Sequence, residues 1–291
     1  MKYPFDSFIR LLRFSLEGEK FGAPGNQDYF KTRLGLDIYL KPKSALSKVS
    51  SKISGNYTAA SDLRQFESQT PAKMKSYLSF GYLLQRTGFI NPYNMFVSLE
   101  LGDSYQKTSL ELNFRYSYYG KKRGLDARLF AGTMLNTGSS DPLYSFTASG
   151  RSGPELYLYQ GFYPDRFTSF PETVWSKQMT MTEGGLVTPV SDSLGYSRWL
   201  CSLTLTSSLP EKVTWIPVKP FASFVMDRPG GGTSSKAVLF FEAGFKAGIW
   251  DFFEIWVPLL VSDNINSING SIKGRIRFVF RLDKLNPLLL K

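Results

Sequence analysis

Apolar and polar residues alternate with a period of two in segment after segment of this chain. In one segment, Leu110, Leu112 and Phe114 are separated by Glu111 and Asn113. Successive side chains of a β-strand point to opposite faces of the sheet, so this period predicts strands with one apolar and one polar face. Charged side chains are frequent on the polar face, and burying them against a second layer would cost a large desolvation free energy. A transmembrane β-barrel avoids this cost, because its apolar face contacts lipid and its charged face lines the interior.

The lengths of these segments also favour a barrel. Most span about 9 to 13 residues, which is enough to cross a bilayer when a strand is tilted, whereas soluble strands average about five or six residues. We predict an all-β, antiparallel transmembrane β-barrel of about twelve strands, an even number as in single-chain bacterial barrels. Residues 1–291 form a single domain in this prediction. The predicted strands are 8–17, 29–41, 77–86, 93–103, 107–118, 125–135, 177–186, 197–207, 218–226, 236–247, 252–260 and 273–283.

The predicted connections fall into two length classes. Residues 120–124 and 249–251 are short, whereas 42–76, 136–176 and 262–272 are long. In bacterial barrels the short turns are periplasmic and the long loops are extracellular. The many aromatic residues of 136–176 indicate a loop that packs over or into the mouth of the barrel.

Composition and charge agree with a membrane location. Aromatic residues make up 15% of the chain, and such rings are enriched at the two membrane interfaces. The formal net charge is +11, which suits a barrel that faces anionic lipopolysaccharide. The lysines and arginines are scattered and no nucleic-acid-binding motif occurs, so we expect lipid and lipopolysaccharide, and no nucleic acid, as partners.

The chain has no histidine and one cysteine, Cys201. Catalysis by Ser-His-Asp or Cys-His groups therefore has no base, and an HExxH zinc site has no ligands. We expect no catalytic residue, no cofactor and no metal ion in this chain. The glycine-rich segment 227–236 lacks the spacing of a phosphate-binding loop and is interpreted as a strand connection.

The predicted strands place cations and anions in nearly equal numbers on the interior face. A balanced set of this kind can cross-link the wall of a barrel through charge-assisted hydrogen bonds, whereas a ring of one sign would favour ion selectivity. Residues 275, 277 and 281 form a row of arginines that we expect to pair with Glu242 and Glu254. The predicted interior charges are Arg33, Asp37, Glu100, Glu111, Arg115, Asp126, Arg128, Glu242, Lys246, Glu254, Arg275, Arg277 and Arg281.

Several segments together resemble a known bacterial module. The segments are 124–135 (GLDARLFAGTML), 156–167 (LYLYQGFYPDRF), 176–186 (SKQMTMTEGGL), 252–260 (FFEIWVPLL) and 275–282 (RIRFVFRL). They resemble, in the same order, strands of the outer-membrane barrel domain at the C-terminus of certain bacterial metallopeptidases of the membrane alanyl aminopeptidase family. The resemblance covers the second half of the chain well and the first hundred residues loosely.

The resemblance implies a membrane-embedded module without catalytic residues, because the HExxH and GxMEN motifs of the peptidase domain are absent. The expected function is to anchor or present a partner domain, such as an N-terminally fused or associated zinc aminopeptidase, at the bacterial outer membrane. One alternative is a transport or assembly pore gated by residues 136–176, and a second is a soluble, basic, β-rich binding protein. Since residues 1–18 do not resemble a signal peptide, we expect this sequence to be a fragment or C-terminal module of a longer exported protein.

Overall fold

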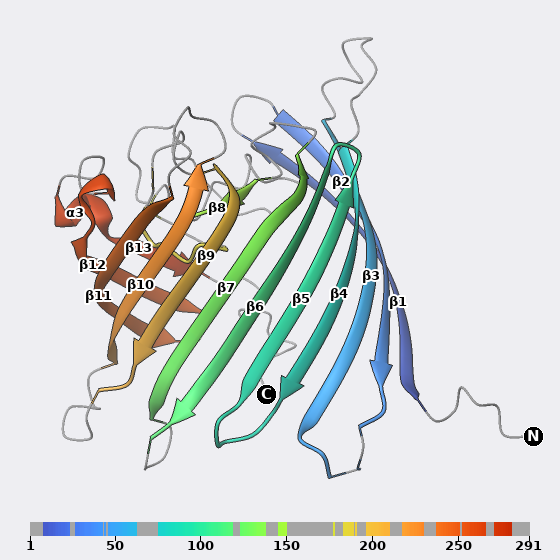
Figure 1. The fold of residues 1–291 in the computed structure, drawn as a ribbon, viewed down its shortest axis with the longest axis horizontal. Coiled ribbons are helices and arrows are strands. Elements are labelled where there is room, and N and C mark those ends of the chain that lie inside the picture. Colours follow the sequence, from blue (N-terminus) through green and yellow to red (C-terminus); the bar gives the residue numbers. More distant parts are fainter. Residues whose placement is uncertain are drawn as a thin grey trace, which may run out of the picture.

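In the computed structural model, the strands among the described residues form one antiparallel sheet of 13 strands. Figure 1 shows the strands as long, tilted ribbons of a single curved sheet. The described residues are 8–23, 27–42, 44, 46–62, 75–118, 123–137, 145–149, 177, 183–188, 190, 196–209, 217–229, 237–250, 252–265 and 271–280. The strands are β1 (Ile9–Ala23), β2 (Gln27–Leu40), β3 (Val49–Asp62), β4 (Lys75–Arg86), β5 (Tyr93–Gly102), β6 (Tyr105–Ser117), β7 (Gly124–Thr137), β8 (Phe146–Thr147), β9 (Tyr196–Ser207), β10 (Val218–Pro229), β11 (Val238–Trp250), β12 (Phe253–Val261) and β13 (Arg277–Phe280). A one-turn helix, α3 (Ile272–Arg275), precedes the last strand.

The strands follow one another in the sheet in the order of the sequence. Each pairs with its predecessor and successor, except that the two-residue β8 lies off this path and pairs with β9, so that β7 is followed by β9. Within the described residues no ladder joins β1 to β13, and the sheet is open there. No helix in the described part of the chain is long and apolar enough to span a membrane.

Alternation along each strand creates two faces of different chemistry. In β4, Leu78 and Phe80 are exposed, whereas Ser79 and Gly81 line a cavity on the other side. We call the side of Leu78 and Phe80 the outer face, and the side of Ser79 and Gly81 the inner face. The period-two pattern of the sequence therefore corresponds to the pleat of the strands.

The position of β3 differs from the sequence prediction. Residues 42–76 were expected to form a long loop, but Val49–Asp62 pairs with both β2 and β4. The segment contains small residues and only two large apolar ones, Ile53 and Tyr57, so its alternation is weak. Pairing on both edges satisfies its backbone groups and stabilises a strand that its side chains specify poorly.

The predicted strand 177–186 is also wrong. Of this range the structure describes residue 177 and residues 183–186, and these lie outside the named strands. Leu186 instead makes an isolated parallel bridge to Ser149. The main path nevertheless holds twelve strands, because the unpredicted β3 replaces this one.

The beginning of the predicted last strand, 273–283, is helical. Ser271 caps α3, and its side chain accepts a hydrogen bond from the Gly274 amide at 3.3 Å. Arg275 therefore lies at the end of a helical turn, and the strand begins at Arg277. A serine at the N-cap position supplies an acceptor that an extended chain would not use.

The antiparallel order places every second connection at the same end of the sheet. The connections after β2, β4, β6, β9 and β11 share one end, which we call the turn end, and the start of β1 lies there as well. The longest connection, between β7 and β9, leaves the opposite end. Of the predicted loop 136–176, the structure describes residues 136–137, which belong to β7, and residues 145–149.

Buried apolar side chains gather on the inner face of the second half of the sheet. They come from β7 to β11, from residues 146–148, and from residues 186, 190 and 265. The cluster consists of Phe130, Phe146, Ala148, Leu186, Val190, Leu200, Val225, Phe240 and Ile265. Residues from the long connection therefore fill this half of the inner face.

Candidate functional site: the inner face of the sheet

The first half of the inner face is polar because charged, hydroxyl and glycine residues meet at the same level of successive strands. Cross-strand register brings these residues side by side from β1 to β7. One such row consists of Arg13, Asp37, Ser54, Gly81, Ser98, Ser109 and Gly132.

Ion pairs connect neighbouring strands on this half of the inner face, and each joins residues that are opposite or diagonal in the register. The pairs are Glu17–Arg33 at 3.8 Å, Glu19–Lys31 at 3.5 Å, Asp37–Lys52 at 3.1 Å, Glu100–Lys107 at 3.1 Å, Glu111–Arg128 at 3.0 Å and Arg115–Asp126 at 3.2 Å. Enclosure varies among them, since the Lys107 side chain is 7% exposed and the Arg33 side chain 45% exposed. An exposed pair contributes little to stability, whereas removal of one partner from an enclosed pair is costly because the other charge stays buried.

A cavity of about 420 Å³ lies on the inner face of β1 to β5. Its charged lining comes from three cations and three anions, namely Arg13, Arg33, Lys52, Glu17, Asp37 and Glu100. The remaining lining includes serine hydroxyls, Asn56, Tyr77 and Phe96. The volume falls in the range of small-molecule pockets.

The other half of the inner face is occupied by residues 183–188. Arg128 Nη1 and Ser202 Oγ both donate to the Glu183 carbonyl oxygen, at 3.0 Å and 2.9 Å. Thr147 Oγ1 donates to Glu183 Oε2 at 2.8 Å. The Gly184 amide donates to the carbonyl of Thr147 at 2.9 Å. These bonds hold the segment against β7 and β9.

Glu242 on β11 binds the same segment from the opposite side. Its carboxylate accepts hydrogen bonds from the Val187 amide at 2.6 Å, the Thr188 amide at 3.1 Å and Thr188 Oγ1 at 2.8 Å. The side chain is fully buried, and the positive charge of Arg277 acts on it. A buried carboxylate that accepts three hydrogen bonds is a strong anchor, because its own desolvation is compensated only while the segment is in place.

The remaining predicted residues of the C-terminal strands are Lys246, Glu254, Arg275, Arg277 and Arg281. Lys246 Nζ lies 3.9 Å from Glu254 Oε2 on the next strand. Arg275 Nη1 donates to the Leu259 carbonyl at 3.4 Å, and Arg277 Nη1 donates to the Gly274 carbonyl at 2.6 Å. The predicted row of three arginines on one strand is wrong for Arg275, which belongs to α3. Arg281 lies outside the described residues.

Among the inner-face charges that sequence reasoning missed are Glu17, Lys52, Lys107 and Glu183. Lys52 was missed because its strand was interpreted as a loop, and Glu183 because its segment was interpreted as a strand. Glu17 and Lys107 belong to predicted strands and fall on the polar side of the alternation. Extending the same period to the ends of those strands would have found them.

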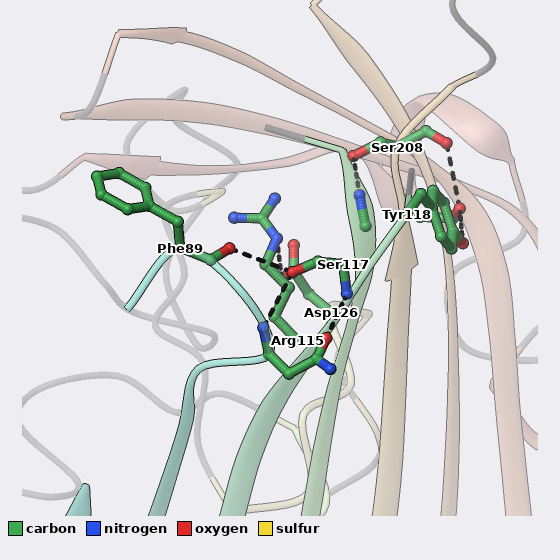
Figure 2. A network of polar contacts seen from close by, with 9 residues as sticks. Phe89, Arg115, Ser117, Tyr118, Asp126 and Ser208 are labelled. Carbon is green, nitrogen blue, oxygen red and sulfur yellow. Dashed lines mark hydrogen bonds and ion pairs between the residues drawn. The ribbon is translucent and has the colours of Figure 1, made fainter. Parts of the chain in front are cut away.

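At the turn end, a polar network connects the turns of neighbouring hairpins (Figure 2). The Asn91 amide donates to Ser117 Oγ at 3.1 Å, and the Ser117 amide donates to Asn91 Oδ1 at 2.9 Å. Ser117 Oγ also donates to the Phe89 carbonyl at 3.3 Å, and Asn91 has a φ of 48°. Asparagine tolerates this left-handed conformation better than most residues. The Arg115–Asp126 ion pair lies beside this network in Figure 2.

The described residues contain no group of three or more His, Cys, Asp and Glu side chains that could hold a metal ion. No family model matches the sequence, and no curated protein matches it. Among solved structures, CdiB from Acinetobacter baumannii is similar at 11% identity and a TM-score of 0.43. The match covers 87% of this chain and 45% of that chain, so this chain spans less than half of CdiB's length. At this TM-score the similarity assigns neither a family nor a function.

Proposed function

We propose that the chain is a membrane-embedded β-barrel of a bacterial outer membrane. The observation that carries this proposal is a row of register partners on the outer face that is apolar on β1 to β7 and on β9 to β11. The row consists of Leu12, Ile38, Ile53, Tyr82, Val97, Leu110, Ala131, Cys201, Met226 and Leu239. Such a belt is the lipid-facing surface expected of a transmembrane barrel.

The exposure of the outer face supports this assignment. Phe14 is 77% exposed, Leu16 76% and Leu239 59%. Apolar surface of this extent is unusual on a protein surrounded by water. In lipid, backbone groups at an open strand edge have no water to bond, so the proposal includes pairing of β1 with β13 to close the barrel.

A pair of adjacent substitutions on β4 tests the lipid contact. Phe80→Arg places a charge on the outer face, and Ser79→Arg places the same charge in the polar cavity. We expect Phe80→Arg to lower the free energy of unfolding by about 2–4 kcal/mol if the site is near the bilayer midplane, and Ser79→Arg to have a much smaller effect. Folding is measured by heat-modifiable gel migration and urea titration in lipid vesicles. Equal effects of the two variants on the free energy of unfolding would contradict the assignment of Phe80 to the lipid-facing side and Ser79 to the interior.

The finer proposal is that the barrel anchors a partner domain, and that this partner is a zinc aminopeptidase. The identity of the partner rests on the sequence resemblance alone. The anchoring role is supported by the inner face, where residues 183–188 fill one half and ion pairs brace the other. The turn end would face the periplasm, and the long connections would meet lipopolysaccharide.

Deletion of the DNA that encodes this chain in the host bacterium tests the anchoring role. We expect aminopeptidase activity to move from the outer-membrane fraction to the soluble fraction, because the enzyme loses its attachment. Reintroduction of the intact chain is the matched control, and it is expected to return the activity to the outer-membrane fraction. An unchanged distribution of the activity would contradict anchoring.

A transport or assembly pore is the second candidate, and the cavity beside β1 to β5 favours it. Planar-bilayer recording of the purified protein distinguishes the two functions. An anchor with a filled interior gives no steady conductance. A steady conductance that increases when Glu242→Ala weakens the hold on residues 183–188 would favour the pore.

A further inference from the structure

Three glycines on the inner face are covered by an aromatic ring from the same or a neighbouring segment. A Cβ atom at Gly102 would collide with the Tyr105 ring, one at Gly132 would lie 2.6 Å from Phe146, and one at Gly81 would lie 2.7 Å from Phe96. Aromatic rings commonly cover glycines in sheets, where they restore the packing that glycine lacks.

Phe96 is more exposed than the other two rings. Tyr105 and Phe146 are each 1% exposed, whereas Phe96 is 36% exposed and lines the cavity. The missing Cβ of Gly81 lets the Phe96 ring lie close to the β4 backbone, with Ser54 Oγ also 2.7 Å from the position of that Cβ. The cavity therefore contains an accessible aromatic ring among polar groups.

The charges around this ring do not favour a charged ligand. The cavity is lined by three cations and three anions, and Arg33 and Lys52 each pair with a carboxylate on a neighbouring strand. Hydroxyl and amide groups supply both donors and acceptors, among them Ser79, Ser98 and Asn56. A neutral ligand with many hydroxyls and one apolar face would match this combination.

We propose that this cavity binds a neutral saccharide unit, with Phe96 stacking against the apolar face of the sugar ring. The C–H groups on one face of a pyranose suit the electron-rich face of an aromatic ring. Its hydroxyls suit the serines, Asn56 and the paired charges on the cavity wall. The inference goes beyond membrane insertion and depends on the proposed barrel only for the enclosure of the cavity.

The test uses the intact protein folded in lauryldimethylamine oxide, a detergent without a sugar headgroup. The probes are maltotriose, cellotriose and chitotriose, with citrate as a charged comparison. Binding is measured by saturation-transfer NMR and isothermal titration calorimetry. We expect saturable binding of at least one trisaccharide, little dependence on salt, and no saturable binding of citrate.

Phe96→Leu is the informative variant, because leucine still covers Gly81 but has no flat face. It is expected to weaken trisaccharide binding about tenfold. The matched control is Phe114→Leu on the outer face of β6, the strand beside that of Phe96. Phe114 does not line the cavity, so the affinity is expected to change by less than about twofold. Both variants must keep the heat-modifiable migration of the folded protein.

Two outcomes would overturn the proposal. One is the absence of saturable binding of all three trisaccharides to folded protein, and the other is equal binding by Phe96→Leu and the unsubstituted protein. Salt-sensitive binding of citrate in place of the sugars would assign the cavity to an anion and would also overturn it. None of these results affects the lipid contact, which the Phe80→Arg and Ser79→Arg pair tests separately.

Discussion

The two halves of the inner face belong to one sheet but differ in what covers the strands. From β1 to β6 the wall is braced by ion pairs between strands, and a cavity remains. From β7 to β12 the space is filled by residues 145–149, 183–188 and 190 around an apolar cluster. Cross-strand register alone therefore brings the charges of a polar wall together, whereas filling the interior requires a segment distant in sequence.

The largest expected effect comes from Glu242→Ala, which removes the anchor of the filled half. The substitution leaves the amides of Val187 and Thr188 without their acceptor in a buried site. We expect the free energy of unfolding to fall by about 3–5 kcal/mol, as measured by urea titration in vesicles.

Glu254→Ala is the control for this substitution, because Glu254 is also on the inner face but is partly exposed beside Lys246. A smaller loss of stability is expected there. If the two alanine variants unfold at the same urea concentration, residues 187–188 do not depend on Glu242.

Leu200→Ala and Ser98→Ala compare the halves at one level of the sheet, since both residues belong to the same cross-strand row. Leu200 is fully buried in the apolar cluster, and its truncation is expected to cost about 2–5 kcal/mol. Ser98 loses a 2.7 Å hydrogen bond to Ser109, which is expected to cost about 1 kcal/mol. If Ser98→Ala lowers the free energy of unfolding in urea more than Leu200→Ala does, the filled half is not the more stabilised one.

Asn91→Ala tests whether the turn end is a third, independently stabilised region. The variant loses the Asn91 Oδ1 acceptor of the Ser117 amide and places alanine at a positive φ. We expect a loss of about 1–2 kcal/mol, and no change in the protection of residues 183–188 from hydrogen exchange. Asn91→Gly relieves the backbone strain but not the lost hydrogen bond, so it should recover part of the stability. An identical loss for both variants would exclude strain as a cause.

The smallest effect is expected for the exposed ion pair Glu17–Arg33. A double-mutant cycle should give a coupling free energy of about 0.2–1 kcal/mol that disappears at high salt. The Glu100–Lys107 pair is more enclosed, with side chains 17% and 7% exposed, and its coupling should persist in salt. Equal salt sensitivity of the two pairs would show that the hollow half is solvated throughout.

Much of the fold could be predicted from the sequence where large apolar residues alternate with charged ones. The predicted strand 107–118 corresponds closely to β6, and 125–135 to β7. Prediction failed at β3, whose small residues carry little pattern. It also failed at residues 177–186, where alternating methionines and threonines resemble a strand although the described part of the segment lies outside the named strands.

The candidate site also has residues that could be predicted from the sequence and residues that could not. Arg115 and Asp126 were predicted to face the interior, and the structure places them 3.2 Å apart on paired strands. The partners of Glu242 were not predicted, because they are two backbone amides and a hydroxyl more than fifty residues away in the sequence. Phe96 was also missed, since an aromatic ring on the polar side of a strand has no distinct sequence signal.

The sequence by itself determined which side chains share a face, because the period of two follows from the geometry of any extended backbone. It also determined that one face would be apolar and the other balanced in charge. Only the tertiary structure decided which part of the inner face is filled and which is hollow. That outcome depends on contacts between residues far apart in the chain, and local alternation carries no information about them.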